Sequence, residues 1–192
     1  MIEIFQLYLF LGMILHKVVW EVLKKKGPVN IGSDPNRPSL FKQLVKFTKV
    51  VFLLFLIVQT LLLPAVFPIT TNPEILRWIG LILYTIGLVI ALVGRFQLGK
   101  NWANIEDYQI LQEQQLVDQG LYALIRHPIY TGDILLVLGL ELALNSWLVL
   151  LVIPLAFVTY RQAKEEEQIL ADAFEGYAAY QEKTKLFLPY VL

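Results

Sequence analysis

The densest group of residues able to do chemistry lies between positions 120 and 133, in the stretch GLYALIRHPIYTGD. Arg126, His127 and Tyr130 stand beside a proline that fixes the backbone, where a polar segment gives way to an apolar run. A cation, an imidazole and a phenol at such a boundary suit an anionic or polar ligand held at a membrane surface. Arg126 and His127 could equally be interfacial anchors whose polar ends reach towards lipid head groups.

A second group lies at the end of the last apolar run, where Arg161 precedes three successive glutamates, residues 165–167. At about 100° per residue, one helical face can hold only one or two of these three carboxylates. Arg161 and Glu165 are four residues apart and could form an ordinary helix-surface pair, worth roughly a few tenths of a kcal/mol. The alternative is a shared site with the Arg126–Tyr130 segment, because both groups are expected on the same membrane face.

Long apolar runs separate these polar groups and indicate that lipid is the solvent for much of the chain. Of the 192 residues, 57% are hydrophobic and 17% are charged, against about a quarter charged in a soluble domain. Sixteen basic and sixteen acidic residues balance, so net charge gives no argument for nucleic acid. Cysteine is absent, which excludes disulfides and thiol catalysis, and two histidines are too few for a His-rich centre. No metal is therefore expected.

Five apolar segments are predicted to be membrane helices, which makes the chain an all-α integral membrane protein of one domain. They run roughly over residues 2–22, 44–67, 75–98, 129–144 and 147–160. The parts of the domain are three spans (1–98), a polar motif segment (99–130), a helical hairpin (131–160) and a charged, amphipathic tail (161–192). This tail is expected to lie on the membrane surface or to cover the polar segment.

The distribution of lysine and arginine predicts the orientation. Six basic residues lie around the first loop: Lys24, Lys25, Lys26, Arg37, Lys42 and Lys46. Around the connection between the second and third segments the single basic residue is Arg77, in the first turn of the third segment, and the hairpin turn at 145–146 carries no charge. The N-terminus is therefore predicted to lie outside, and the motif segment and C-terminus in the cytosol. The first apolar run has neither a basic leader nor a small-residue cleavage site, so it is expected to be a retained span.

Together, the two groups resemble the isoprenylcysteine carboxyl methyltransferase family of membrane enzymes. The shared pattern is Leu116-Val117-x-x-Gly120-x-Tyr122, then Arg126-His127-Pro128-x-Tyr130, a hairpin, Arg161, a pair at Glu165-Glu166, and a Phe-x-x-Tyr-x-x-Tyr tail ending at Tyr180. The stretch QLGKNW at 97–102 is also similar to the one that this family places before the motif. The Arg-His-Pro-x-Tyr element recurs in phospholipid N-methyltransferases and some sterol-type reductases. Gly132-Asp133 resembles the Gly-Asp pair that follows the corresponding motif in the reductases.

The resemblance implies S-adenosyl-L-methionine as cofactor and a cytosolic cofactor-binding cap over about five transmembrane helices. The cofactor pocket carried over from the family comprises Leu116, Val117, Gly120, Tyr122, Arg126, His127 and Tyr130, closed by Glu166. The acceptor implied is a lipophilic, prenyl-type substrate, namely the carboxylate of a prenylated cysteine. The catalytic residues implied are Arg161, Glu165 and Glu166: the guanidinium would grip that carboxylate, whereas an amine acceptor would want a glutamate as base.

Three alternatives stay open: a phospholipid N-methyltransferase, an NADPH-dependent reductase of an isoprenoid or sterol-type double bond, and a non-enzymatic membrane scaffold. The reductase would need a basic site for a 2′-phosphate, and residues 100–125 hold no additional Arg/Lys cluster. Two isolated polar residues are predicted to be unconnected with the site. Glu141 lies near the outer end of its segment and is expected to be solvated, and His16 is expected to be interfacial.

Overall fold

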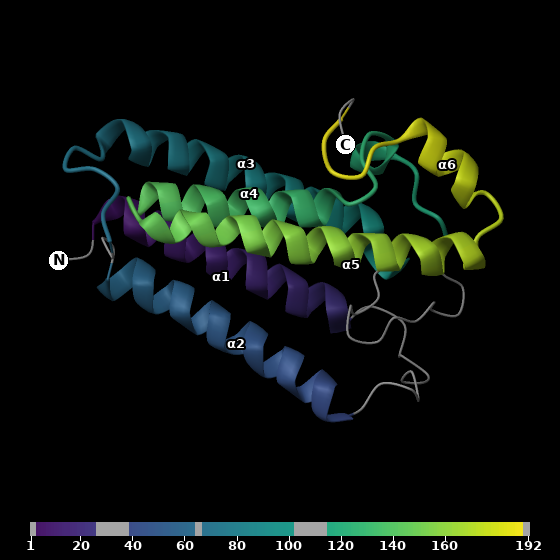
Figure 1. Ribbon diagram of the computed structural model, residues 1–192, viewed down its shortest axis with the longest axis horizontal. Helices are drawn as coiled ribbons and strands as arrows, with labels where there is room; N and C mark the ends of the chain where they lie inside the picture. The colour runs from purple at the N-terminus through teal and green to yellow at the C-terminus, as the bar shows by residue number, and fades with distance from the viewer. Residues whose placement is uncertain (1–2, 26–38, 64–66, 102–114, 190–192) are drawn as a thin grey trace.

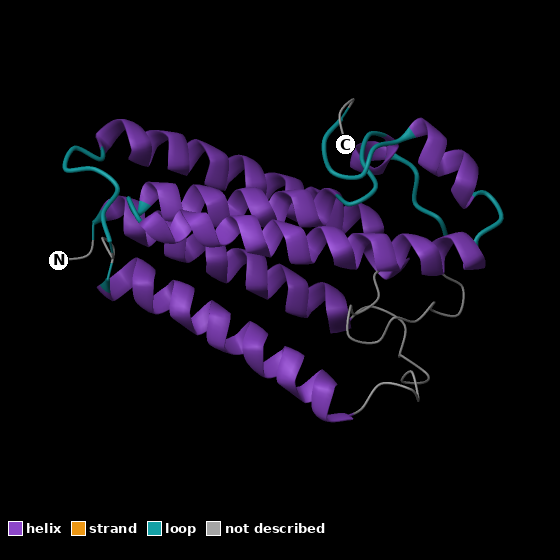
Figure 2. Cartoon of the chain, viewed as in Figure 1, coloured by secondary structure: helices purple, strands orange, loops and turns teal. Residues whose placement is uncertain are grey.

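Long helices run side by side in the computed structural model, and a smaller assembly that includes α6 lies at one end of this bundle (Figure 1). The structure describes residues 3–25, 39–63, 67–101 and 115–189. The helices are α1 (Ile4–Lys25), α2 (Ser39–Leu62), α3 (Glu74–Leu98), α4 (Pro128–Ala143), α5 (Val152–Ala173) and the short α6 (Tyr177–Lys183). Three 3-10 turns, η1 (Gly99–Asn101), η2 (Gly120–Ala123) and η3 (Trp147–Leu151), complete them. Within the described ranges no strand is formed, which confirms the all-α prediction (Figure 2).

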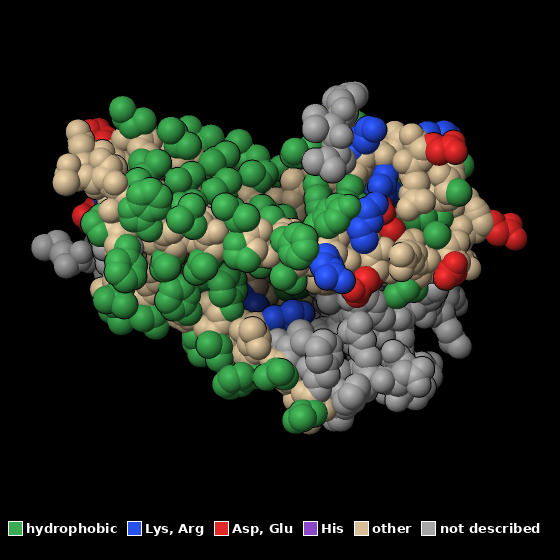
Figure 3. Space-filling model, viewed as in Figure 1, with side chains coloured by type: hydrophobic (Ala, Val, Ile, Leu, Met, Phe, Trp, Pro, Cys, Tyr) green, Lys and Arg blue, Asp and Glu red, His purple; other side chains and the backbone are tan. Residues whose placement is uncertain are grey.

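Among the described residues, three helical stretches are long and apolar enough to cross a membrane: residues 4–23, 74–101 and 147–173. The second expected span gives a shorter apolar stretch, Phe47–Leu62, and the fourth gives the 16-residue α4. Apolar side chains cover the surface along the bundle, and charged ones gather at the end that carries α6 (Figure 3). So large an exposed apolar surface suits lipid rather than water, as expected of an integral membrane protein.

The helix that contains the last expected span does not end with it at Tyr160. Instead α5 continues to Ala173, so the three glutamates belong to the same helix as the apolar run. No glycine or proline interrupts this helix after its first turn, and the chain turns only at Gly176. The polar part therefore begins as a rigid extension of a bundle helix, and only α6 and the residues after it fold back.

Glycines bring α3 and α4 into close backbone contact. A Cβ built at Gly139 would lie 2.2 Å from the backbone nitrogen of Tyr84, and one at Gly87 would lie 2.5 Å from that of Leu136. Gly132, half of the reductase-like Gly-Asp pair, belongs to this seam, since its Cβ would lie 2.5 Å from the nitrogen of Ala91. Small residues let membrane helices pack backbone to backbone. The seam thus fixes the start of α4, where the motif lies, against α3.

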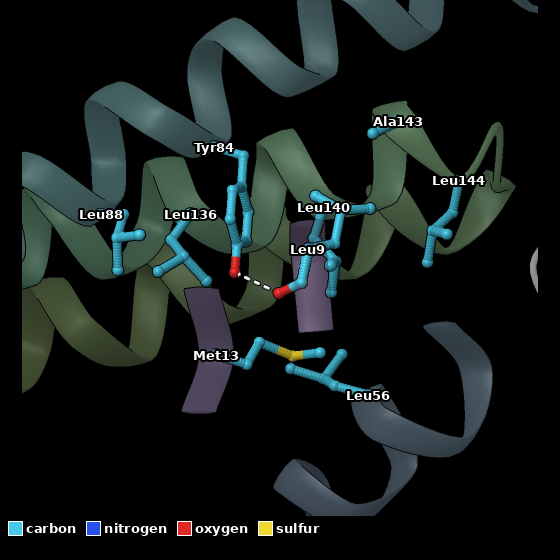
Figure 4. Close-up of a cluster of buried hydrophobic side chains, with 9 residues drawn as sticks. All are labelled: Leu9, Met13, Leu56, Tyr84, Leu88, Leu136, Leu140, Ala143 and Leu144. Atoms are coloured by element: carbon cyan, nitrogen blue, oxygen red, sulfur yellow. Dashed lines mark hydrogen bonds between the residues drawn. The ribbon is translucent and has the colours of Figure 1, made fainter. Parts of the chain in front are cut away.

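A buried apolar cluster lies between α1, α2, α3 and α4 (Figure 4). Tyr84 on α3 reaches across it and donates a 2.6 Å hydrogen bond from its hydroxyl to the backbone oxygen of Leu9 on α1. Gly12 lies one turn further along α1, where a Cβ would come within 2.5 Å of the same hydroxyl. These contacts set the position of α1 along the α3–α4 pair.

The expectation that Glu141 is solvated was wrong. Its side chain is 2% exposed, and its carboxylate accepts a 2.8 Å hydrogen bond from the side-chain nitrogen of Gln59 on α2. The hairpin turn covers it from the other side: Asn145 adopts a left-handed conformation, and the backbone nitrogen of Ser146 donates to the backbone oxygen of Glu141. The carboxylate therefore joins α2 to the hairpin.

Candidate functional site

The motif segment and the acidic run meet at the polar end of the bundle (Figure 1). Tyr130 donates a 2.6 Å hydrogen bond from its hydroxyl to one carboxylate oxygen of Glu166, and Nδ1 of His127 lies 3.6 Å from the other. The rings of His127 and Tyr130 are stacked, with centroids 5.3 Å apart and planes 1° from parallel. His127 is the N-cap residue of α4 and Tyr130 lies in its first turn, so the start of one helix holds both rings.

Arg126 forms an ion pair with Glu167, and both side chains are almost completely buried. Lys164, three residues before Glu167 on α5, adds a second cation 3.0 Å from the other carboxylate oxygen. Arg126 also donates hydrogen bonds to the backbone oxygens of Thr184 at 2.6 Å and Gln181 at 3.2 Å. The guanidinium thus ties α5 to the end of α6, and its expected contact with a cofactor stays a prediction.

The chain after α6 runs back along the motif. The backbone nitrogens of Arg126 and His127 donate to the backbone oxygens of Lys185 and Leu186, at 2.8 and 3.1 Å. The side chain of Thr131 donates to the backbone oxygen of Phe187 at 3.0 Å. The end of the tail therefore lies along the motif, which agrees with the expectation that the tail covers the polar segment. We call residues 184–187 the C-terminal strap.

Gly120 and Tyr122 shape the approach to the motif. Gly120 has a φ of 64°, and the side chain of Gln97 fills the place of its missing Cβ and accepts a 2.9 Å hydrogen bond from the backbone nitrogen of Leu121. Glycine is needed here because a left-handed backbone coincides with this close approach. Tyr122 is buried, and its backbone oxygen accepts a 2.8 Å hydrogen bond from the hydroxyl of Tyr180 on α6. The η2 turn is thereby held between α3 and α6.

The remaining predicted site residues lie around this core. Leu116 and Val117 are half-buried in the segment that leads to η2. Arg161 and Glu165 are exposed on α5, whereas Glu166 is half-buried and Glu167 is buried. Helical geometry thus turns one glutamate outwards and two inwards, as expected. The catalytic roles of Arg161 and Glu165 stay predictions.

Three residues of the site were not found by sequence reasoning. Glu167 is the partner of Arg126, Gln97 holds η2, and Gln162 donates a 3.2 Å hydrogen bond from its side chain to the hydroxyl of Tyr130. Gln162 had a usable signal, because it lies four residues before Glu166 on the same face of one helix. Glu167 was recognised as part of the acidic run, but its pairing with Arg126 was not predicted. Gln97 lay in the stretch that carried the family resemblance, although no role was assigned to it.

His127 is the least satisfied polar group of the site. Burial is the main cause that lowers the pKa of His127 to about 4, against the opposing effect of Glu167, so the imidazole is neutral at pH 7. Its Nε2 is buried and lacks a hydrogen-bond partner among the described residues. A buried nitrogen in this position costs free energy unless a ligand or water satisfies it. Together with the carboxylate of Glu166 and the ring of Tyr130, it offers a polar and aromatic surface to a ligand.

Known proteins are similar to this chain in sequence and in fold. The cobalt-zinc-cadmium resistance protein CzcN of Cupriavidus metallidurans is 33% identical over 117 residues, which are 58% of this chain and 51% of that protein. The protein-S-isoprenylcysteine O-methyltransferase of Xenopus laevis is 29% identical over 116 residues, which are 59% of this chain and 40% of that enzyme. The chain thus spans about half the length, or less, of these curated relatives.

A solved structure of the eukaryotic intramembrane Ras methyltransferase ICMT (isoprenylcysteine carboxyl methyltransferase) has the same fold. Its TM-score is 0.62 at 18% identity, and the match covers 97% of this chain and 68% of that one. The resemblance carried by the motif is therefore confirmed at the level of relatives and fold. The model of the phospholipid methyltransferase family matches residues 75–176, which include α3, the motif, α4 and the acidic run of α5. Since this match covers more than half of the chain, the protein belongs to the phospholipid methyltransferase family.

Proposed function

We propose that this protein transfers a methyl group from S-adenosylmethionine to a lipophilic acceptor at the cytosolic face of its membrane. The observation that carries the proposal is the convergence of His127, Tyr130 and Glu166, which join the family motif to the acidic helix at the polar end of an apolar bundle. Membership of the family supports methyl transfer. The position of the site supports a lipophilic acceptor, because a water-soluble cofactor and a membrane-held substrate can both reach such a boundary.

The residues present fit the cofactor. It has a cationic sulfonium and an ammonium group, which suit the carboxylate of Glu166 and the aromatic face of Tyr130. It also has hydrogen-bonding groups that can satisfy the buried Nε2 of His127. We assign its binding to these three residues together with Leu116, Val117, Gly120 and Tyr122. When bound, the cofactor supplies an electrophilic methyl group on a positively charged sulfur.

Methyl transfer to a nucleophile requires alignment and a dry approach rather than proton transfer at the cofactor. The hydroxyl of Tyr130 donates a hydrogen bond to Glu166 and accepts one from the side chain of Gln162, and these two bonds hold Glu166 against the start of α4. The Arg126–Glu167 pair and the C-terminal strap cover this arrangement from the polar side. Arg126 is therefore proposed as a positioning residue that holds the C-terminal strap in place.

The relatives suggest two kinds of methyl acceptor, which differ in whether a proton must be removed before methyl transfer. The isoprenylcysteine relatives favour a prenylcysteine carboxylate, which is already anionic at neutral pH and which Arg161 could hold bidentately. The family model favours a phospholipid amine, which arrives protonated and must lose a proton before it can attack.

Calorimetric titration of the purified protein with S-adenosylhomocysteine and with NADPH tests the proposal. S-adenosylhomocysteine should bind and NADPH should not, and labelled S-adenosylmethionine should then methylate a farnesylcysteine analogue or phosphatidylethanolamine. His127→Ala should weaken binding of S-adenosylhomocysteine, whereas Lys183→Ala, at an exposed position of α6, should not. Binding of NADPH alone would contradict the methyltransferase proposal and favour the reductase. Binding of neither compound would favour the non-enzymatic scaffold.

A further inference from the structure

A second polar group lies between α1 and α4, outside the site described above. Nε2 of His16 on α1 lies 3.0 Å from a carboxylate oxygen of Asp133 on α4, and the two side chains are 24% and 43% exposed. The ring of Trp20 stacks on the imidazole, with centroids 4.1 Å apart and planes 20° from parallel. The structure gives His16, which was expected to be interfacial, a specific partner on another helix. Ionisable groups among membrane helices are costly and mark functional positions.

The pair has the geometry of a general base oriented by a carboxylate. An ionised Asp133 accepts the hydrogen of Nε2, which leaves Nδ1 of His16 as the unprotonated nitrogen. Asp133 would also stabilise the imidazolium that forms when Nδ1 takes up a proton, which is how a third group supports a catalytic base. The stacked indole of Trp20 limits rotation of the imidazole. Both side chains are partly exposed, so a substrate can reach them.

This pair lies beside the candidate site. Asp133 follows Tyr130 by three residues on α4, so the two side chains are neighbours on the helix surface, about 4.5 Å apart along its axis. Tyr130 is hydrogen-bonded to Glu166, which we assign to the cofactor. One turn of α4 therefore carries the cofactor contact, and the next turn, deeper in the apolar bundle, carries the proton acceptor. An acceptor held by its lipid chain would approach from that side.

Charge distinguishes the two acceptors. An ionised Asp133 attracts an ammonium group and repels a carboxylate. The face of Trp20 adds a second group that favours a cation. A carboxylate acceptor needs no base, whereas an amine acceptor needs one.

We propose that His16 and Asp133 form the proton-accepting pair for the methyl acceptor, and that this acceptor is a lipid primary amine. This rests on the proposed methyl transfer. The lipid ammonium gives a proton to Nδ1 of His16, and its nitrogen lone pair then forms the new nitrogen–carbon bond. The sulfur–methyl bond breaks, and its electron pair stays on sulfur. The proton passes from His16 to water, so each turnover adds one methyl group and releases one proton.

The test uses the full chain with phosphatidylethanolamine vesicles and, separately, a farnesylcysteine analogue. The wild-type protein should methylate phosphatidylethanolamine, and His16→Gln and Asp133→Asn should each lower kcat by about 10²–10⁴-fold, the scale of lost general-base catalysis. Affinity for S-adenosylhomocysteine should stay within about twofold in both variants. Lys17→Gln, an exposed neighbour on α1, is the control and should keep its kcat.

Asp133→Asn keeps the size of the side chain and a hydrogen-bonding partner for His16, so a purely structural contact predicts an unchanged kcat. Unchanged kcat in this variant would therefore overturn the proposal even if His16→Gln failed to fold. Methylation of the farnesylcysteine analogue alone would overturn it while leaving the proposed function intact. Absence of both methyl transfer and S-adenosylhomocysteine binding in the wild-type protein would refute the proposed function itself.

Discussion

Gly139→Ala should destabilise the protein, although alanine is the better helix former. In an unpacked helix this change would gain up to about 1 kcal/mol. Here the new Cβ would lie 2.2 Å from the backbone nitrogen and 2.7 Å from the Cα of Tyr84, and 2.6 Å from the backbone oxygen of Gly80. Ordinary contact begins at 3.4 Å, so α3 and α4 must separate by about 1 Å, and such a gap forfeits about half of the dispersion attraction across it.

Overpacking of this kind costs about 1–3 kcal/mol, and rigid backbone on both sides favours the upper part of that range. After the gain in helix propensity, we expect a net loss of roughly 1–2 kcal/mol, or a Tm lower by about 2–8 °C at this chain length. Thermal unfolding in detergent measures it. Because Tyr84 also holds α1 and α4 carries His127, affinity for S-adenosylhomocysteine should fall as well.

Gly176→Ala is the matched control, since nothing lies within 4 Å of its Cβ position and its φ is negative. It should leave the Tm and the affinity near their wild-type values. If Gly139→Ala unfolds at the same temperature as Gly176→Ala, or above it, the backbone seam does not limit the packing of α3 against α4, and the reasoning fails.

The sequence and the site lead to four further predictions. A reporter fused after Leu192 should be cytosolic and one inserted at Thr71 external; a cytosolic Thr71 would reverse the orientation. His127→Ala should weaken S-adenosylhomocysteine binding by about 1–3 kcal/mol in calorimetry, the cost of removing a partner from a buried polar contact, and unchanged affinity would return His127 to an anchoring role. Because burial lowers the pKa of His127 to about 4, the unfolded chain binds a proton that the folded chain does not as pH falls from about 6.5 to 4. Stability should therefore decline across this window, and less steeply in His127→Asn. Arg161→Lys should keep methyl transfer to phosphatidylethanolamine within about twofold, because Arg161 is exposed; a loss of about 10²-fold would instead indicate that its planar fork orients the acceptor.

Much of the fold follows from local patterns in the chain. Each of the five apolar segments predicted a helix, because a membrane span must satisfy its own backbone hydrogen bonds. The end of the last helix could not be placed in the same way. Hydropathy falls at Arg161, but hydropathy reports the change of solvent and not the end of a helix, which runs on to Ala173 until the chain turns at Gly176.

The site was predictable where one helix determines the geometry. Helical spacing limits how many of the three glutamates can point inwards. The family resemblance placed His127 and Tyr130 in the same pocket as Glu166. Contacts between distant segments were not predictable. His16 and Asp133 are separated by 117 residues, and their meeting depends on the position of α1, which Tyr84 and its hydrogen bond to Leu9 fix.

Glu141 shows why an ionisable residue among membrane helices indicates function only when its accessibility is known. Its place near the end of α4 suggested contact with water, but the hairpin turn and Gln59 enclose it and leave 2% of it exposed. Depth along a helix axis does not determine burial, because burial also depends on which neighbours return to cover that end. His16 and Asp133 have the opposite combination. Asp133 lies deeper along α4 than the motif, His16 contacts it from α1, and both side chains remain partly exposed. A substrate can reach that pair and cannot reach Glu141, so the same residue chemistry is structural at one end of α4 and available for reaction near the other.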